Sequence, residues 1–144
     1  MLVGEYRFSV DSKGRTSLPA KFRKKIGKVV YLTRGIDGMI DVYTKDSWKK
    51  LEEKMSQLSM SKKADRDFKR LVLGAMSEVE PDKQGRIILS NVLREYAGIE
   101  NGGRVVWVGV GDKAEIWSED RWEKGLKDKL ENFENISESL EGII

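Results

Sequence analysis

The sequence contains one internal duplication, which limits the possible folds more than any other feature of the chain. The segment Asp11-Ser-Lys-Gly-Arg15 returns 71 positions later as Asp82-Lys-Gln-Gly-Arg86. Residues of like kind flank both segments at the same spacing: Phe8 and Val79, Leu18 and Leu89, Phe22 and Leu93, Arg23 and Arg94, Gly27 and Gly98. After a short insertion, residues 42–48 align with 116–122. Matches that keep their order over this length indicate two repeats of one structural unit.

Both repeats predict the same order of secondary structure. A strand runs into a turn at Gly14 or Gly85, where glycine allows the positive φ that a tight turn needs. A second strand, a short helix and a β-hairpin follow, and amphipathic helices close each repeat. The expected strands are 7–10, 15–18, 29–33, 40–43, 78–81, 86–89, 105–110 and 114–117. We therefore expect an α+β, strand-rich fold.

The length of the chain indicates how the two repeats associate. A half of roughly 70 residues buries too little apolar surface to be stable alone, so the halves should pack together or oligomerise. Within the 144 residues we expect a first module with its closing helix at 1–58, a connecting helix at 59–75, and a second module with its C-terminal helix at 76–144. The helices carry apolar faces suited to core or subunit contacts, for example Trp122, Leu126, Leu130 and Phe133.

The composition excludes several classes of site. The chain has no cysteine and no histidine, which removes disulfides, thiolate zinc sites and the usual general base. The N-terminus lacks the features of a signal peptide, and the longest apolar run, 105–110, is too short to cross a bilayer. We expect a cytoplasmic protein without cofactor, metal, membrane partner or small-molecule substrate.

Charge is distributed unevenly along the chain. Residues 1–35 carry nine cations and two anions, whereas residues 118–144 carry four cations and eight anions. A basic first part and an acidic last part favour an anionic partner that docks on one face. A lysine-rich solvated surface is the alternative interpretation of the same pattern.

The repeated turns carry the residues with the clearest chemistry. Arg15 and Arg86 follow the turn glycines, and Lys13 and Lys83 precede them. A two-stranded ribbon fits the major groove of DNA, where arginine can bind guanine O6 and N7 and lysine can neutralise phosphates. The sequence therefore predicts that these four residues contact double-stranded DNA.

Two other interpretations of the same turns remain open. Asp11 and Asp82 can pair with the arginine four residues later and only brace the turn, an exposed interaction that contributes about 0–1 kcal/mol. In either interpretation we expect the two aspartates and the two glycines, Gly14 and Gly85, to be structural residues of the turn. The aspartates could also form a general acid–base pair, which we regard as remote. An enzyme is not expected.

The doubled Asp-x-x-Gly-Arg motif with matched flanks resembles the MraZ family. The resemblance covers essentially the whole chain, including the YRFSVDSKGR entry and Leu18-Pro19-Ala20 at the start of the first short helix. It implies two tandem swapped-hairpin modules, like those of AbrB-type regulators, which together form a double-split β-barrel with flanking helices.

The resemblance also implies a function. It predicts a nucleoid-associated transcriptional regulator that recognises direct repeats in the promoter of the division and cell-wall gene cluster, with repression as the simplest outcome. It implies self-assembly into a ring-shaped homo-oligomer. By position, Arg15 and Arg86 take the DNA-contacting role with Lys13 and Lys83 as neighbours, and Arg7 is a weaker candidate.

The two repeats differ in charge. Residues 76–111 carry four bases and five acids, whereas the first repeat is basic. We therefore expect Arg15 to contribute more to DNA binding than Arg86. The main rival function is a protein–protein scaffold without DNA readout, which would use the apolar helices and the acidic tail. Antitoxin-like regulators share the hairpin module but usually carry one repeat per chain, so the duplication argues against them.

Overall fold

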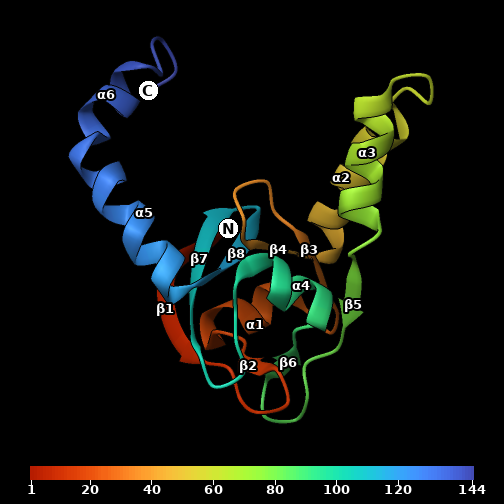
Figure 1. Ribbon diagram of the computed structural model, residues 1–144, viewed down its shortest axis with the longest axis vertical. Helices are drawn as coiled ribbons and strands as arrows, with labels where there is room; N and C mark the ends of the chain where they lie inside the picture. Colours follow the sequence, from red (N-terminus) through yellow and green to blue (C-terminus); the bar gives the residue numbers. More distant parts are fainter.

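The fold is built on two antiparallel sheets, and both contain strands from the two repeats (Figure 1). The computed structural model describes all residues, 1–144. The larger sheet has the strand order β1-β7-β8-β4-β3-β5, and the smaller pairs β2 with β6. The strands are β1 (Leu2–Ser9), β2 (Arg15–Ser17), β3 (Val30–Arg34), β4 (Ile40–Tyr43), β5 (Ser77–Val79), β6 (Arg86–Ile88), β7 (Arg104–Gly111) and β8 (Lys113–Ser118).

Six helices accompany the sheets: α1 (Ala20–Ile26), α2 (Lys45–Ser56), α3 (Lys63–Leu73), α4 (Asn91–Ala97), α5 (Glu119–Glu131) and α6 (Phe133–Glu138). Their ends follow local sequence rules. Ser90 caps α4 by accepting a hydrogen bond from the Leu93 N–H, and Gly98 ends the helix in the left-handed conformation. No helix is both long and apolar enough to span a membrane.

The two repeats exchange their first strands. β1 of the first repeat pairs along its full length with β7 of the second, from Leu2 opposite Gly111 to Ser9 opposite Arg104. In return, β5 of the second repeat pairs with β3 of the first. β4 and β8 join the two halves with Ile40 opposite Ile116, equivalent positions in the duplication. Neither repeat completes a sheet alone, which confirms the prediction that the halves pack together.

The predicted α+β, strand-rich fold with flanking helices is confirmed, but the sheets do not close into a barrel. The larger sheet ends at β1 on one side and at β5 on the other, and these two strands are not paired. β2 and β6 have three residues each and bond only to each other. The larger sheet is therefore open at both edges, and the expected double-split barrel is not confirmed.

The main core, of 19 buried residues, lies between the sheets and the short helices α1 and α4. Phe22 of α1 and Leu93 of α4, matched positions in the duplication, are both fully buried in it. The β2–β6 ribbon contributes Thr16 and Ile87, which lie opposite each other with only 1% of each residue exposed. Because these central residues face inward, their strand neighbours must face outward.

The longer helices form two arms that extend away from the end of the molecule that carries β2 and β6 (Figure 1). The α2–α3 arm has a small core of its own, formed by Trp48, Met55 and Val72, with the Tyr31 ring stacked on Trp48. The α5–α6 arm has no such core. Leu130 is 58% exposed and Phe133 62% exposed, so this apolar face is not covered within the protomer.

Candidate nucleic-acid interface

The first repeated turn is built around the Asp11 carboxylate. Its Oδ1 accepts hydrogen bonds from the backbone N–H groups of Lys13 and Arg15, both at 2.9 Å. Gly14 has a φ of +78°, which an L-amino acid rarely adopts, and its N–H donates to the Asp11 carbonyl at 3.0 Å. The second turn repeats this geometry with Asp82, Gln84, Arg86 and Gly85.

Both motif arginines bond to the aspartate of their own turn. Arg15 Nε donates to Asp11 Oδ2 at 2.7 Å, and Arg86 Nε donates to Asp82 Oδ2 at 2.9 Å. The pKa of each aspartate is lowered, mainly by the hydrogen bond from the backbone N–H of the arginine. The hydrogen bond from the arginine side chain lowers the pKa further, and partial desolvation opposes the shift. The brace considered as an alternative is therefore present in both repeats.

The brace leaves the terminal nitrogens of each guanidinium without a hydrogen-bond partner in the protein. It uses Nε alone, and Arg86 Nη1 lies 4.0 Å from Asp11 Oδ2. The Arg15 and Arg86 side chains are 28% and 31% exposed. Since one edge of the planar group is held and the other is free, bracing the turn and presenting a donor pair are compatible.

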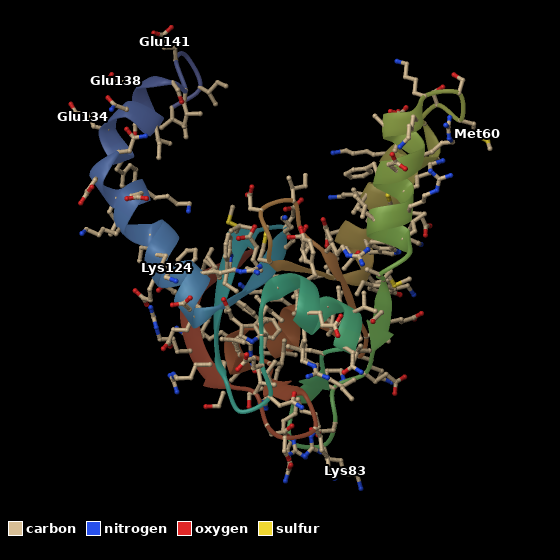
Figure 2. The ribbon with its side chains drawn as sticks, in the orientation of Figure 1. Met60, Lys83, Lys124, Glu134, Glu138 and Glu141 are labelled. Carbon is tan, nitrogen blue, oxygen red and sulfur yellow. The ribbon has the colours of Figure 1, made fainter.

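The two turns belong to one surface and are not separate tips. The Leu18 N–H donates to the Gly85 carbonyl, and the Leu89 N–H donates to the Gly14 carbonyl, both at 2.8 Å. Figure 2 shows Lys83 at the end of the molecule opposite the arms. The exchange of strands thus brings residues 71 positions apart in the sequence into one site.

Two further arginines, not singled out from the sequence as site residues, join this surface. Arg23 of α1 bonds across the repeats to the Gln84 carbonyl at 3.4 Å, and its guanidinium lies over Gly85. Arg94 of α4 lies over Gly14 in the same way. The sequence did offer a signal for these two residues: they are equivalent in the duplication, and a matched pair of arginines close to the motif indicates a shared role.

We define the tip patch as the charged residues of the two turns together with the two helix arginines that lie over them. Its members are Lys13, Arg15, Arg23, Lys83, Arg86, Arg94, Asp11 and Asp82. Six cations against two anions leave a net charge of +4. A compact surface of this charge attracts polyanions.

The first turn has more support than the second. Asn101 Nδ2 donates to the Ser12 carbonyl at 3.1 Å, and the Val10 N–H donates to the Gly103 carbonyl at 2.8 Å. Pro81 is the repeat equivalent of Val10 and has no N–H to donate. The insertion of the second repeat, which contains Asn101 and Gly103, therefore supports the first turn alone.

Arg7 does not lie in the tip patch. On β1 it pairs with Glu5 at 3.0 Å, with Glu123 at 2.5 Å and more loosely with Glu119 at 3.8 Å. The hydrogen bond to Glu123 is the main cause of the raised pKa of Arg7. Three carboxylates surround its guanidinium, and the contacts with Glu119 and Glu123 tie β1 to α5.

The aspartates of the turns are poorly suited to proton transfer. Each carboxylate accepts two backbone hydrogen bonds and one from an arginine, and its pKa is lowered, which makes it a weak base. No group of three or more metal-ligating side chains is present that could hold an ion. The geometry thus gives no support to the acid–base interpretation.

Comparison with known proteins extends these observations over the whole chain. The family described as "MraZ protein, putative antitoxin-like" matches the chain twice, over residues 1–71 and 72–142. "Transcriptional regulator MraZ" of Caldanaerobacter subterraneus subsp. tengcongensis is 45% identical over 141 residues, covering 98% of this chain and 97% of the relative. The protein of the same description from Natranaerobius thermophilus is 46% identical over 140 residues, covering 97% and 96%.

A solved structure, the solution structure of PHS018 from Pyrococcus horikoshii, covers 82% of this chain and 96% of its own, with 14% identity and a TM-score of 0.36. That likeness is too low to bear on the fold. The two relatives above are described as regulators of transcription and neither as an enzyme, which agrees with the prediction that this chain is not one. Two family matches that together span residues 1–142, and relatives at 45–46% identity over nearly the full length, establish that the chain belongs to the MraZ family.

Proposed function

We propose that the protein is a sequence-specific, DNA-binding transcriptional regulator whose tip patch enters the major groove. The observation that carries the proposal is the geometry of the two motif arginines, each held at Nε by its own aspartate with its terminal nitrogens free. An arginine fixed in this way can donate two parallel hydrogen bonds to guanine O6 and N7. Lys13 and Lys83, both exposed beside the arginines, suit contacts to phosphates.

The ribbon fixes the spacing of the two arginines. Arg15 and Arg86 are diagonal neighbours on β2 and β6, a relationship that separates such residues by about 7–8 Å. Bases along one DNA strand rise by about 3.4 Å each, so this separation of the two residues corresponds to roughly two steps. One protomer therefore contacts a short site, and several sites are needed for tight, specific binding.

In this proposal the exchanged strands are the intrachain equivalent of an AbrB-like swapped-hairpin dimer. The functional unit is the pair of modules, 1–58 and 76–144 joined by 59–75, because β1 and β5 each complete the sheet of the opposite repeat. The DNA targets are short direct repeats in the promoter of the division and cell-wall gene cluster. The protein is cytoplasmic and nucleoid-associated, and occupation of the promoter represses transcription by excluding polymerase.

The arms support the proposal of a ring-shaped homo-oligomer. Trp48 on α2 and Trp122 on α5 are equivalent in the duplication, but α3 covers the apolar face of α2 and no helix covers that of α5. The uncovered residues Leu130 and Phe133 are more than half exposed. A neighbouring protomer would supply the missing cover.

Charge complements this apolar face. Residues 130–144 contain four glutamates and no cation, whereas residues 61–73 contain five cations and two aspartates. Figure 2 shows Glu134, Glu138 and Glu141 on one arm and Met60 at the end of the other, too far apart to meet within one protomer. Pairing the acidic arm with the basic arm of a neighbour is a head-to-tail contact, which generates a ring when the rotation closes.

A binding titration tests the DNA proposal. The probe is a labelled duplex taken from immediately upstream of the protein's own gene, and affinity is measured by fluorescence anisotropy. Arg15→Ala should weaken binding by roughly 5- to 150-fold, the range for removal of a bidentate hydrogen bond to a base. Arg86→Ala should weaken it less, because the second turn lacks the support of Asn101 and carries fewer basic neighbours in sequence.

Arg7→Ala is the matched control, since its charge is already balanced by Glu5, Glu119 and Glu123. Its affinity should equal that of the wild type. Equal losses in Arg15→Ala and Arg86→Ala would contradict the proposed asymmetry of the turns. Unchanged binding in both would contradict the DNA-binding role of the patch and favour the scaffold, which predicts interaction through the arms alone.

A further inference from the structure

The outer face of the β2–β6 ribbon contains four residues in two cross-strand pairs. Thr16 and Ile87 at the centre of the strands point into the core. The residues on either side therefore point outward, with Arg15 opposite Ile88 and Ser17 opposite Arg86. Directly opposed side chains on one face have Cβ atoms about 4.5–5.5 Å apart. Each motif arginine thus has one close partner on the surface proposed to meet DNA.

The two partners differ in chemistry. Ile88 is 52% exposed. It lies on β6, the strand that also carries Arg86, and directly follows the fully buried Ile87. Its equivalent in the first repeat is Ser17, 71 positions earlier. About half of Ile88 is left uncovered by the protein, and no requirement of the core places an isoleucine there, because the smaller, polar Ser17 occupies the same position on β2. An exposed β-branched side chain opposite an arginine that is proposed to read a base is placed to contact an apolar group on the DNA.

The only apolar group on the edge of a base pair in the major groove is the C5 methyl of thymine, and aliphatic side chains recognise it by direct contact. From these observations we propose that Ile88 is a specificity-determining residue that packs against a thymine methyl next to the guanine bound by Arg15. Ser17 instead offers a hydroxyl beside Arg86, which can donate to or accept from several bases. This inference rests on the proposed DNA-binding function and adds the identity of a second base.

The difference between Ile88 and Ser17 has a geometric consequence. The duplication relates the two arginines by a pseudo-two-fold axis through the ribbon, and a patch with that symmetry would read both directions of a short site alike. An isoleucine on one side and a serine on the other remove the symmetry. Each protomer then binds its site in one orientation, as head-to-tail protomers on direct repeats require.

The test is a selection followed by a change of one chemical group in the DNA. Wild-type protein is used to enrich duplexes from a pool with a randomised central window, and the consensus site is remade with deoxyuridine in place of each thymine in turn. Deoxyuridine lacks only the C5 methyl. Wild-type affinity should fall by about fourfold at one thymine, the effect expected when one buried methyl group is removed. Ile88→Ser should bind the thymine and deoxyuridine sites equally, and its own selected consensus should lack that thymine.

Val110→Ser is the matched control. Val110 is also a β-branched strand residue and is 47% exposed, but it does not belong to the tip patch and lies at the end of β7 opposite Arg104. It should keep the fourfold preference. Thermal unfolding of Ile88→Ser should match the wild type, since its side chain contributes little to the core. The inference is overturned if wild-type protein shows no methyl preference at any thymine, or if Ile88→Ser retains it. If the wild-type protein enriches no sequence at all, the proposed DNA-binding function itself fails.

Discussion

Arg94 lies over Gly14 of the opposite repeat so closely that a Cβ on Gly14 would come within 3.0 Å of the Arg94 Nε. Arg23 lies over Gly85 more closely still, and a Cβ at that glycine would overlap the guanidinium carbon. Each helix arginine thus covers the turn that the other repeat supplies. Glycine is therefore required at both positions for two reasons: the backbone has a positive φ, and the arginine occupies the space that a Cβ atom would take.

Alanine at these glycines should affect stability and DNA binding separately. Gly14→Ala and Gly85→Ala should each lose about 1–2 kcal/mol of unfolding free energy from the positive φ, measured by urea denaturation. Gly102→Ala, at a φ of +81° with nothing within 4 Å of the added Cβ, should lose a similar amount. Only the two turn variants should also weaken DNA binding, because the added methyl displaces Arg94 or Arg23. Normal DNA affinity in both turn variants would remove these arginines from the patch.

The turn aspartates should make part of the stability acid-sensitive. The folded-state pKa of Asp11 and of Asp82 is lowered, so their stabilising contribution is present at neutral pH and is lost as the pH falls through those values, below about 4. The double variant Asp11→Asn/Asp82→Asn should be less stable than the wild type at pH 7, and its stability should decline less between about pH 5 and 3. Urea denaturation across this range measures both. Asp37→Asn, an exposed residue without an ion pair, should follow the wild-type curve.

The pair of Lys113 and Asp41 should be the most costly ion pair to break. Lys113 Nζ lies 2.6 Å from Asp41 Oδ1, and the Asp41 side chain is only 7% exposed. Lys113→Ala would leave that carboxylate without its cation in the sheet, at a cost of about 3 kcal/mol. Lys63→Ala removes an exposed pair with Asp67 and should cost less than about 1 kcal/mol. Equal changes in the two unfolding curves would show that burial of Asp41 does not matter.

The α5–α6 arm should control the size of the assembly. Phe133→Glu adds a charge to an uncovered apolar face that is already acidic, so the mass measured by light scattering should fall to that of the protomer. Val110→Glu, which changes an apolar residue that is also about half exposed but lies elsewhere, should not change the mass. High salt should also dissociate the wild-type assembly in part, because the proposed contact joins unlike charges. An assembly unaffected by Phe133→Glu would place the contact on another surface.

Much of the fold follows from local sequence patterns, but the exchange between repeats does not. Turn glycines, capping residues such as Ser90 and alternating apolar residues predict the order of strands and helices well. The sequence does not show that β1 pairs with β7. Because the two repeats have the same pattern, β1 fits the sheet of its own repeat as well as that of the other. The same limit applies to Arg23, whose partner Gln84 lies 61 positions away.

The candidate site shows a second limit of sequence reasoning. A spacing of four between Asp11 and Arg15 suits both a brace and a DNA contact, and only the atomic geometry shows that the brace uses Nε alone. Likewise, periodicity identifies the apolar face of α5 but does not say what covers it. Leu130 and Phe133 fit the same pattern as core residues and yet are exposed in the protomer.

The salt dependence of DNA affinity tests the central claim most directly. Affinity for the upstream duplex is measured over a range of salt concentrations for the wild type and for Lys13→Ala/Lys83→Ala. The slope of log K against log salt should become shallower by about 0.9 for each phosphate that is no longer neutralised, so by nearly 2 per protomer engaged. An identical slope and affinity for the two proteins would mean that the tip patch does not meet DNA.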